Sequence, residues 1–321
     1  MLGGDAIRKG ARWLALKRTP RNSGLPHAGL LPAGFSAEHL GSNDYYYWDD
    51  FWGVAGLRAA AAMLAELGES RWQMAFLRDA EDLLEAVQRS LARSDGTPAS
   101  RGTPASPYRR MDAGAIGSLA AGYPLQLFPA NDPRLLATAT FLRENCFVRG
   151  GFFQDMIHSG INVYLTLHVA QVLLRAGDPS WFEMLQSTAA LASPTGQWPE
   201  AIHPQTGGGC MGDGQHVWAA AEWVMAIRHA FVRDESDRLV LASGLPDPWI
   251  KTGMPLSFGP APTPWGPITV SVQHTPQGIA VEWIGDWRGA APLVEVRLQG
   301  FEPRLVQAGE DRVVFAGRAT P

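Results

Sequence analysis

Residues 41–57 read GSNDYYYWDDFWGVAGL, with two adjacent carboxylates, Asp49 and Asp50, among aromatic rings and ahead of an alanine-rich helix expected from about Phe51. Aromatic faces stack on the apolar faces of sugar rings, and carboxylates bind sugar hydroxyls or transfer protons. The stretch therefore predicts a sugar site where a helix begins, with both aspartates as candidate catalytic residues. Its candidate substrate-binding residues are Tyr47, Trp48 and Trp52.

A third candidate catalytic carboxylate lies far downstream, in a loop rich in glycine and proline. Residues 193–216 read SPTGQWPEAIHPQTGGGCMGDGQH, and Glu200 stands in this loop ahead of another expected helix. A carboxylate placed there can face the first pair across a cavity. The remaining candidate substrate-binding residues are Glu38, His39, His158, Trp198, His203, Asp213 and His216.

The composition narrows the classes of protein to which the chain can belong. Its 321 residues, of which 46% are hydrophobic, are enough for two domains with ample core. No uncharged apolar run approaches the roughly 18 residues that a membrane span needs. The net charge of −4 comes from mixed signs without a basic stripe, which argues against nucleic acid as a partner.

Cofactor and metal motifs are also missing from the sequence. The two cysteines, Cys146 and Cys210, form neither a disulfide framework nor a zinc motif with histidines, so we expect buried thiols and no metal. No GxGxxG or P-loop pattern opens a helix, so no nucleotide cofactor is expected. The first residues carry positive charges but no apolar signal-peptide core, which favours a cytoplasmic location.

Apolar residues recur at helical spacing through the first two-thirds of the chain. Glycines such as Gly68 and Gly177 stand where helices should end, and Pro133 and Pro179 stand where helices should begin. The pattern predicts about eight helices. They cover residues of about 7–17, 51–68, 71–92, 112–122, 133–146, 160–176, 180–192 and 215–232.

After Arg233 the pattern changes to short runs of β-branched and aromatic residues separated by turns. We expect strands at 239–242, 268–273, 279–284, 293–299 and 312–315. The predicted division is a helical domain over 1–234 and a small antiparallel, sandwich-like β-domain over 235–321. Helices followed by strands indicate an α+β chain and not a βαβ repeat.

The order of these motifs resembles the second half of the catalytic domain of the six-hairpin, (α/α)6-barrel glycosidases, and above all the glucoamylase-like group. YYYWDDFW at 45–52 stands where that family places its general acid, and TGQWPEAIHP at 195–204 stands where it places its general base. Residues 111–142 resemble the family's intervening helix, turn and next helix. The C-terminal strands resemble the β-domain that often packs beside such barrels.

The resemblance implies an inverting glycoside hydrolase that acts on an oligo- or polysaccharide, with Asp49 or Asp50 as general acid and Glu200 as general base. The family's acid is commonly a glutamate, so the choice between the two aspartates stays open. A complete barrel has twelve helices, whereas about eight are expected here, so the toroid is expected to be partial and to lack its N-terminal side. A fragment, self-association or a partner chain that completes the barrel would account for this.

Other interpretations of the same residues remain open. A polysaccharide lyase on a similar toroid would use Tyr45 to Tyr47, His39 and His216 for proton transfer. A phosphorolytic relative would replace the base and water with phosphate, and a non-catalytic chain would bind glycan or serve as a scaffold. Either aspartate could instead cap the helix, and Glu222 and Trp223 are expected to be packing and helix-surface residues.

Overall fold

The computed structural model describes residues 2–35, 41–93, 102–155, 159–212, 214–306 and 309–316. The candidate residues Glu38, His39, His158 and Asp213 lie outside the described residues. All statements below concern the described part of the chain.

The helices follow the periodicity of the sequence closely. All eight expected segments are helical, although 113–121 is a 3-10 helix and α2 begins at Tyr47, four residues earlier than expected. A short helix, α8, was not expected. The helices are α1 (Leu2–Lys17), α2 (Tyr47–Glu66), α3 (Ser70–Arg93), η2 (Ala113–Ala121), α4 (Pro133–Asn145), α5 (Val163–Ala176), α6 (Trp181–Ala190), α7 (Val217–Phe231) and α8 (Asp247–Lys251).

Local sequence signals explain where these helices begin, end and pack. Asp132 caps α4 by accepting the amide of Arg134 at 2.9 Å, with Pro133 in the first turn. Gly177 ends α5 in the left-handed conformation at φ +82°, which glycine adopts without steric cost. A Cβ on Gly53 would lie 3.1 Å from Leu83 Cδ2, so this glycine lets α2 and α3 approach closely.

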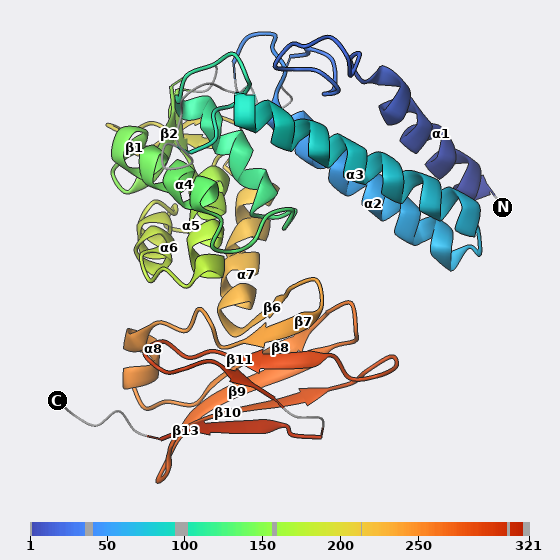
Figure 1. The fold of residues 1–321 in the computed structure, drawn as a ribbon. Helices are drawn as coiled ribbons and strands as arrows, with labels where there is room; N and C mark the ends of the chain where they lie inside the picture. The colour runs from blue at the N-terminus through green and yellow to red at the C-terminus, as the bar shows by residue number, and fades with distance from the viewer. Residues whose placement is uncertain are drawn as a thin grey trace.

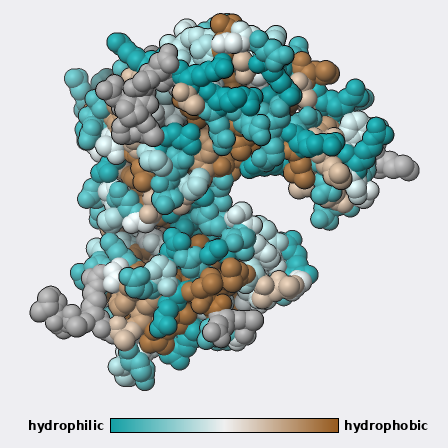
Figure 2. Space-filling view, viewed as in Figure 1, coloured by the Kyte–Doolittle hydropathy of each residue, from teal (hydrophilic) through white to brown (hydrophobic). Residues whose placement is uncertain are grey.

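The helices form an open arc. Four of them pack in series, α2 on η2, η2 on α5 and α5 on α7, while α3, α4 and α6 pack on the outside. Successive helices alternate in direction, so the connections that lead into α2, η2, α5 and α7 meet at one end of the layer (Figure 1). The series ends at α2 and α7, and Figure 2 shows the molecule hollowed between the α2–α3 arm and the strands. The architecture is therefore a partial helical toroid followed by β-sheets.

A small sheet that the sequence did not predict lies among the connections leading into α5 and α7. Its order is β1-β2-β3-β4-β5, and its pairs are antiparallel. It joins residues 147–162 to residues 201–211, and so fixes the segment expected to be a Gly/Pro-rich loop. The strands are β1 (Phe147–Val148), β2 (Gly151–Gln154), β3 (Gly160–Asn162), β4 (Ala201–Ile202) and β5 (Gly209–Met211).

The C-terminal strands form two four-stranded sheets, ordered β13-β10-β9-β8 and β12-β11-β7-β6. All five expected strands are present, and β6, β8 and β12 add to them. Pairing is antiparallel except between β7 and β11, which run parallel. The strands are β6 (Val232–Asp234), β7 (Arg238–Leu241), β8 (Leu256–Ala261), β9 (Ile268–Thr275), β10 (Gly278–Gly285), β11 (Leu293–Val296), β12 (Arg304–Leu305) and β13 (Arg312–Phe315).

Buried ion pairs connect the helical region to the strands. Glu235, just after β6, accepts from Arg175 of α5 at 2.9 Å and from Arg233 of β6 at 2.9 Å. Both guanidinium groups are buried, so their charges depend on this carboxylate. α7 passes into β6 at Val232 without a loop, and the domain division at 234/235 stays a prediction.

Within the described residues, every helix is too short or too polar to cross a lipid bilayer.

Candidate functional site

The two adjacent aspartates of α2 have different surroundings. Tyr46 is the N-cap residue of the helix, so both aspartates lie in the first turn and the capping alternative is wrong. Asp50 is 1% exposed, and its Oδ1 accepts the amide of Leu31 at 2.8 Å. Burial raises the pKa of Asp50 well above the ordinary value, which favours a neutral carboxyl that holds the preceding connection on α2.

Asp49 instead lines a pocket of about 360 Å³ between α1 and α2. Burial raises the pKa of its carboxyl to about 6. Three indoles stand around the same space, and the rings of Trp48 and Trp52 are 5.8 Å apart. The lining residues are Trp13, Leu14, Lys17, Leu31, Pro32, Trp48, Asp49, Trp52 and Gly53.

The tyrosines before this turn are largely structural. Tyr47 was expected to bind substrate, but it is fully buried and its hydroxyl lies 2.9 Å from Ser90 Oγ. Tyr46 is also buried, and Tyr45 stacks on His27 with ring centroids 3.9 Å apart. The structure therefore places Tyr47 in the core, where its side chain packs away from the surface.

Glu200 is half-buried and directly precedes β4. Strand β4 pairs with β3 through Ile202 and with β5 through Ala201, so a sheet holds the backbone that carries this carboxylate. Gly212 packs against Glu200, and a Cβ there would lie 2.8 Å from the Cβ of Glu200. The glycine-rich stretch thus positions a carboxylate.

Trp198 and the histidines of this loop are held by hydrogen bonds. Trp198 is 6% exposed, its Nε1 donates to the carbonyl of Thr188 at 2.9 Å, and its own carbonyl accepts the amide of His216 at 2.9 Å. His203 Nδ1 accepts two backbone amides, each at 3.2 Å. His216 Nδ1 is buried and has no partner among the described residues, which marks it as an atom open to a ligand or water.

A buried carboxylate that the sequence interpretation missed lies beside this loop. Glu222, expected with Trp223 to be a packing or helix-surface residue, is 8% exposed. It accepts hydrogen bonds from Tyr123 Oη at 2.7 Å and Trp218 Nε1 at 3.3 Å, and lies 3.1 Å from His168 Nε2. The signal was present in the sequence, since Trp218 and Glu222 are four residues apart and share a helix face.

The hydrogen-bond partners of Glu222 favour its ionised form. Burial opposes ionisation, but the hydrogen bonds and the charge of His168 outweigh it, and the pKa of Glu222 is lowered. Tyr164 links this cluster to the Glu200 loop, because its ring stacks on Trp218 at 4.5 Å and contacts His216 at 5.2 Å. Glu200, His216 and Glu222 thus belong to one connected region where α5 and α7 begin.

Asp49 and Glu200 lie at the same end of the helical layer but not in one pocket. Asp49 is in the first turn of α2, and Glu200 is in the connection that leads into α7 (Figure 1). The described lining of the Asp49 pocket comes entirely from residues 13–53. The structure therefore shows two separate carboxylate sites at one end of the helical layer.

Neither cysteine belongs to a metal site among the described residues, where no group of three or more His, Cys, Asp or Glu side chains is placed to hold an ion. Both thiols are free. The expectation of two buried thiols is wrong, because Cys146 is half-buried and Cys210 is exposed. Cys210 Sγ lies 3.6 Å from the carbonyl of Ser159, at the edge strand β5.

Comparison with known proteins finds no matching family model and no matching curated protein. Among solved structures, the chain is similar to a glycosidase variant in complex with glucose (20% identity, TM-score 0.44, 60% of this chain and 49% of that one). It is also similar to a bacterial glucoamylase complexed with acarbose (14% identity, TM-score 0.43, 59% and 33%). A third is a GH78 family rhamnosidase of a Bacillus species (15% identity, TM-score 0.46, 92% and 30%).

The three solved structures are all glycosidases, the class that the sequence motifs resemble. This chain spans between 30% and 49% of their lengths. The likeness concerns the fold alone, and at TM-scores of 0.43 to 0.46 it carries no argument about activity.

Proposed function

We propose that this chain is a glycoside hydrolase that acts on an oligo- or polysaccharide by inversion, with Asp49 as general acid and Glu200 as general base. The observation that supports it most is the Asp49 carboxyl, with a pKa raised to about 6, in a pocket walled by three tryptophans. Indole faces suit the apolar faces of sugar rings. A carboxyl with this pKa keeps a protonated fraction near neutral pH, as a general acid requires.

Inversion divides the work between two carboxyl groups. One protonates the leaving oxygen, while the other activates a water molecule on the opposite face of the sugar, with the two roughly 6.5–9.5 Å apart. Glu200 is half-buried, and the backbone that carries it is fixed by β4 and β5. The proposal therefore requires the Asp49 pocket and the Glu200 loop to face one scissile bond of the bound glycan from opposite sides. Lys17 and the open Nδ1 of His216 offer further contacts to hydroxyl groups.

The test is a comparison of Asp49→Asn and Glu200→Gln with wild type on α- and β-linked oligosaccharides. We expect each substitution to lower kcat by roughly 10²–10⁴-fold, the usual contribution of general acid–base catalysis. Release of reducing ends gives the rate, and proton NMR of the first-formed anomer gives the stereochemistry. Glu66→Gln, an exposed carboxylate on the same helix, is the matched control. Wild-type turnover in both variants, or a retained anomer, would contradict the proposal.

The second candidate is a non-catalytic glycan-binding chain whose ring is completed by a partner or by a second copy. It is favoured by the helical series ending at α2 and α7, which expose apolar side chains. Among them are Trp52 at 40%, Met63 at 48%, Val217 at 79% and Val224 at 57% exposure. Glycan binding without release of reducing ends, together with a concentration-dependent increase of mass in light scattering, would favour this candidate.

A further inference from the structure

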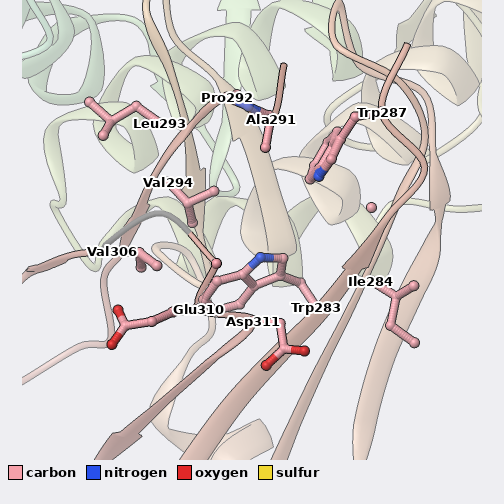
Figure 3. Close-up of a pocket in the computed structure, with 12 residues that line it drawn as sticks. Trp283, Ile284, Trp287, Ala291, Pro292, Leu293, Val294, Val306, Glu310 and Asp311 are labelled. Carbon is pink, nitrogen blue, oxygen red and sulfur yellow. The ribbon is translucent and has the colours of Figure 1, made fainter. Parts of the chain in front are cut away.

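A second pocket, larger than the Asp49 pocket and of about 500 Å³, lies in the strand region (Figure 3). Residues at the end of β10 and in β11 line it, so it opens between the two four-stranded sheets. Its volume falls within the range typical of small-molecule sites. The lining residues are Trp283, Ile284, Gly285, Trp287, Ala291, Pro292, Leu293, Val294, Val306, Gly309, Glu310 and Asp311.

The indole of Trp287 is fixed in position against the backbone. A Cβ on Gly285 would lie 2.0 Å from Cζ2 of Trp287, so the ring rests on a glycine that leaves room for it. The residues on both sides are also tied down, because the Asp286 amide donates to the Pro267 carbonyl at 2.9 Å and the Arg288 amide donates to the Trp265 carbonyl at 2.9 Å. The Trp287 ring is therefore a fixed part of the pocket wall.

A second indole and two carboxylates complete the site. The Trp283 amide donates to the carbonyl of Asp311 at 3.0 Å, which ties the acidic segment to β10. Trp283 is 6% exposed, and in Figure 3 its ring lies between Val294 and the Asp311 carboxylate. Two indoles thus stand in a largely apolar pocket, and among its described lining residues the charged ones are Glu310 and Asp311.

The two indoles and two carboxylates of this pocket favour some classes of small ligand over others. Indole faces stack on the apolar faces of sugar rings, and carboxylates accept hydrogen bonds from hydroxyl groups. The described lining includes no Lys, Arg or His, so these residues offer no cation to phosphates, nucleotides or acidic sugars. A neutral polyhydroxylated ring satisfies both the apolar wall and the carboxylates.

We propose that this pocket binds one or two units of a neutral saccharide, as a second glycan site separate from the Asp49 pocket. The proposal rests on the proposed function only in suggesting that the bound glycan is also the substrate. The role that we assign to the site is to hold the glycan on the protein.

Saccharide binding is measured by isothermal titration calorimetry on the Asp49→Asn variant, in which we expect hydrolysis to be slow, with glucose, maltotriose and cellotriose as probes. We expect saturable binding by at least one probe. Trp287→Ala removes a stacking face and should weaken it by roughly two- to tenfold, the scale of one aromatic contact. Gly285→Ala keeps both indoles but displaces the ring, and should weaken binding similarly. Trp249→Ala, which removes an indole packed on Phe182 outside the pocket, should leave it unchanged.

A second pair of variants measures the contribution of the carboxylates to saccharide binding. Asp311→Asn should weaken binding several-fold, whereas Asp286→Asn, an exposed aspartate outside the pocket lining, should not. Circular dichroism of each variant establishes that the strands are intact. If Trp287→Ala does not fold, Gly285→Ala and Asp311→Asn still decide the question.

Three results would overturn the proposal. One is the absence of binding by all three saccharides up to about 10 mM, beyond the affinity of a weak small-ligand site. Another is binding that Trp287→Ala and Gly285→Ala both leave intact. The third is binding of spermidine, a cationic probe, that no saccharide displaces. Hydrolysis is measured in a separate experiment. Full turnover in both Asp49→Asn and Glu200→Gln would refute the proposed function and would leave the proposal of a second glycan site unaffected.

Discussion

Asp49 and Asp50 are neighbours in the sequence, yet they point to different sides of α2 because successive residues of a helix are rotated about its axis. Their carboxyl groups therefore have different surroundings. Asp50 points to the backbone of Leu31 and is sealed from solvent, whereas Asp49 reaches the tryptophan-walled pocket. The sequence alone left the choice between them open, because a WDD triplet does not show how its helix is rotated. α2 begins at Tyr47, which places both aspartates in its first turn.

The raised pKa of Asp49 predicts a pH dependence. A general acid must be protonated, so kcat/KM should decline as the pH rises above about 6. The ionised form is also disfavoured in the folded protein, so this carboxyl costs stability above its folded pKa and costs nothing below the ordinary value of 3.8. Asp49→Asn should therefore raise Tm at pH 8 and leave it unchanged near pH 3.5.

Differential scanning fluorimetry across pH, with Glu66→Gln as control, measures this stability effect without any substrate. An equal Tm for Asp49→Asn and wild type at pH 8 would show that the carboxyl is not desolvated in solution.

At the scale of elements, the helices could be predicted because their apolar periodicity is local. The β1–β5 sheet could not, since its strands have two to four residues and gain their stability from pairing between distant segments. Glu200 was proposed as a candidate from its neighbours Trp198 and His203. The surroundings of Glu222 could not be predicted, because the pattern of one helix does not reveal that Tyr123 and His168 face it.

The contact between Gly212 and Glu200 allows a matched pair of substitutions. Gly212 and Gly196 both have left-handed φ values, +69° and +78°, so alanine at either position costs roughly 1–2 kcal/mol of backbone strain. Only Gly212→Ala also places a Cβ against Glu200, whereas the space around Gly196 is open. We expect Gly212→Ala to lower kcat strongly and Gly196→Ala to spare it. Urea denaturation and steady-state kinetics on both variants separate the two effects, and equal kinetics would refute a positioning role for Gly212.

At the scale of the whole molecule, the sequence correctly indicated an incomplete toroid followed by strands. It did not fix how far Asp49 lies from Glu200, because that separation depends on how the arc of helices closes. The sequence also gave no sign of the pocket between the sheets, whose residues come from β10, β11 and the segment before β13.

Glu235 joins the two regions, and its loss should destabilise the whole chain. Glu235→Gln would leave Arg175 and Arg233 buried without their counter-charge, at a cost of about 3 kcal/mol, as for other broken buried pairs. Burial opposes its ionisation, but the two arginines outweigh this and lower its pKa, so its stabilisation is present above the ordinary value of 4.5 and is lost as pH falls through the lower folded pKa. Urea unfolding at pH 7 and pH 3 tests both claims.

Asp237→Asn is the matched control, because that carboxylate is fully exposed beside Arg238. Its unfolding midpoint should stay close to wild type at both pH values. A Glu235→Gln midpoint equal to that of the control at pH 7 would show that the buried pairs do not hold the molecule together.

Helix α7 continues directly into strand β6, so it connects the sheet that contains β6 to the side chains near the beginning of the helix. The helix is about 22 Å long at 1.5 Å per residue, and Trp218 and Glu222 stand near its beginning while Val232 is already the first residue of a strand. No glycine or proline interrupts residues 229–233, and no loop separates the helix from the strand. A tilt of the sheet that contains β6 is therefore expected to shift α7 and the side chains near its beginning, beside the Glu200 loop.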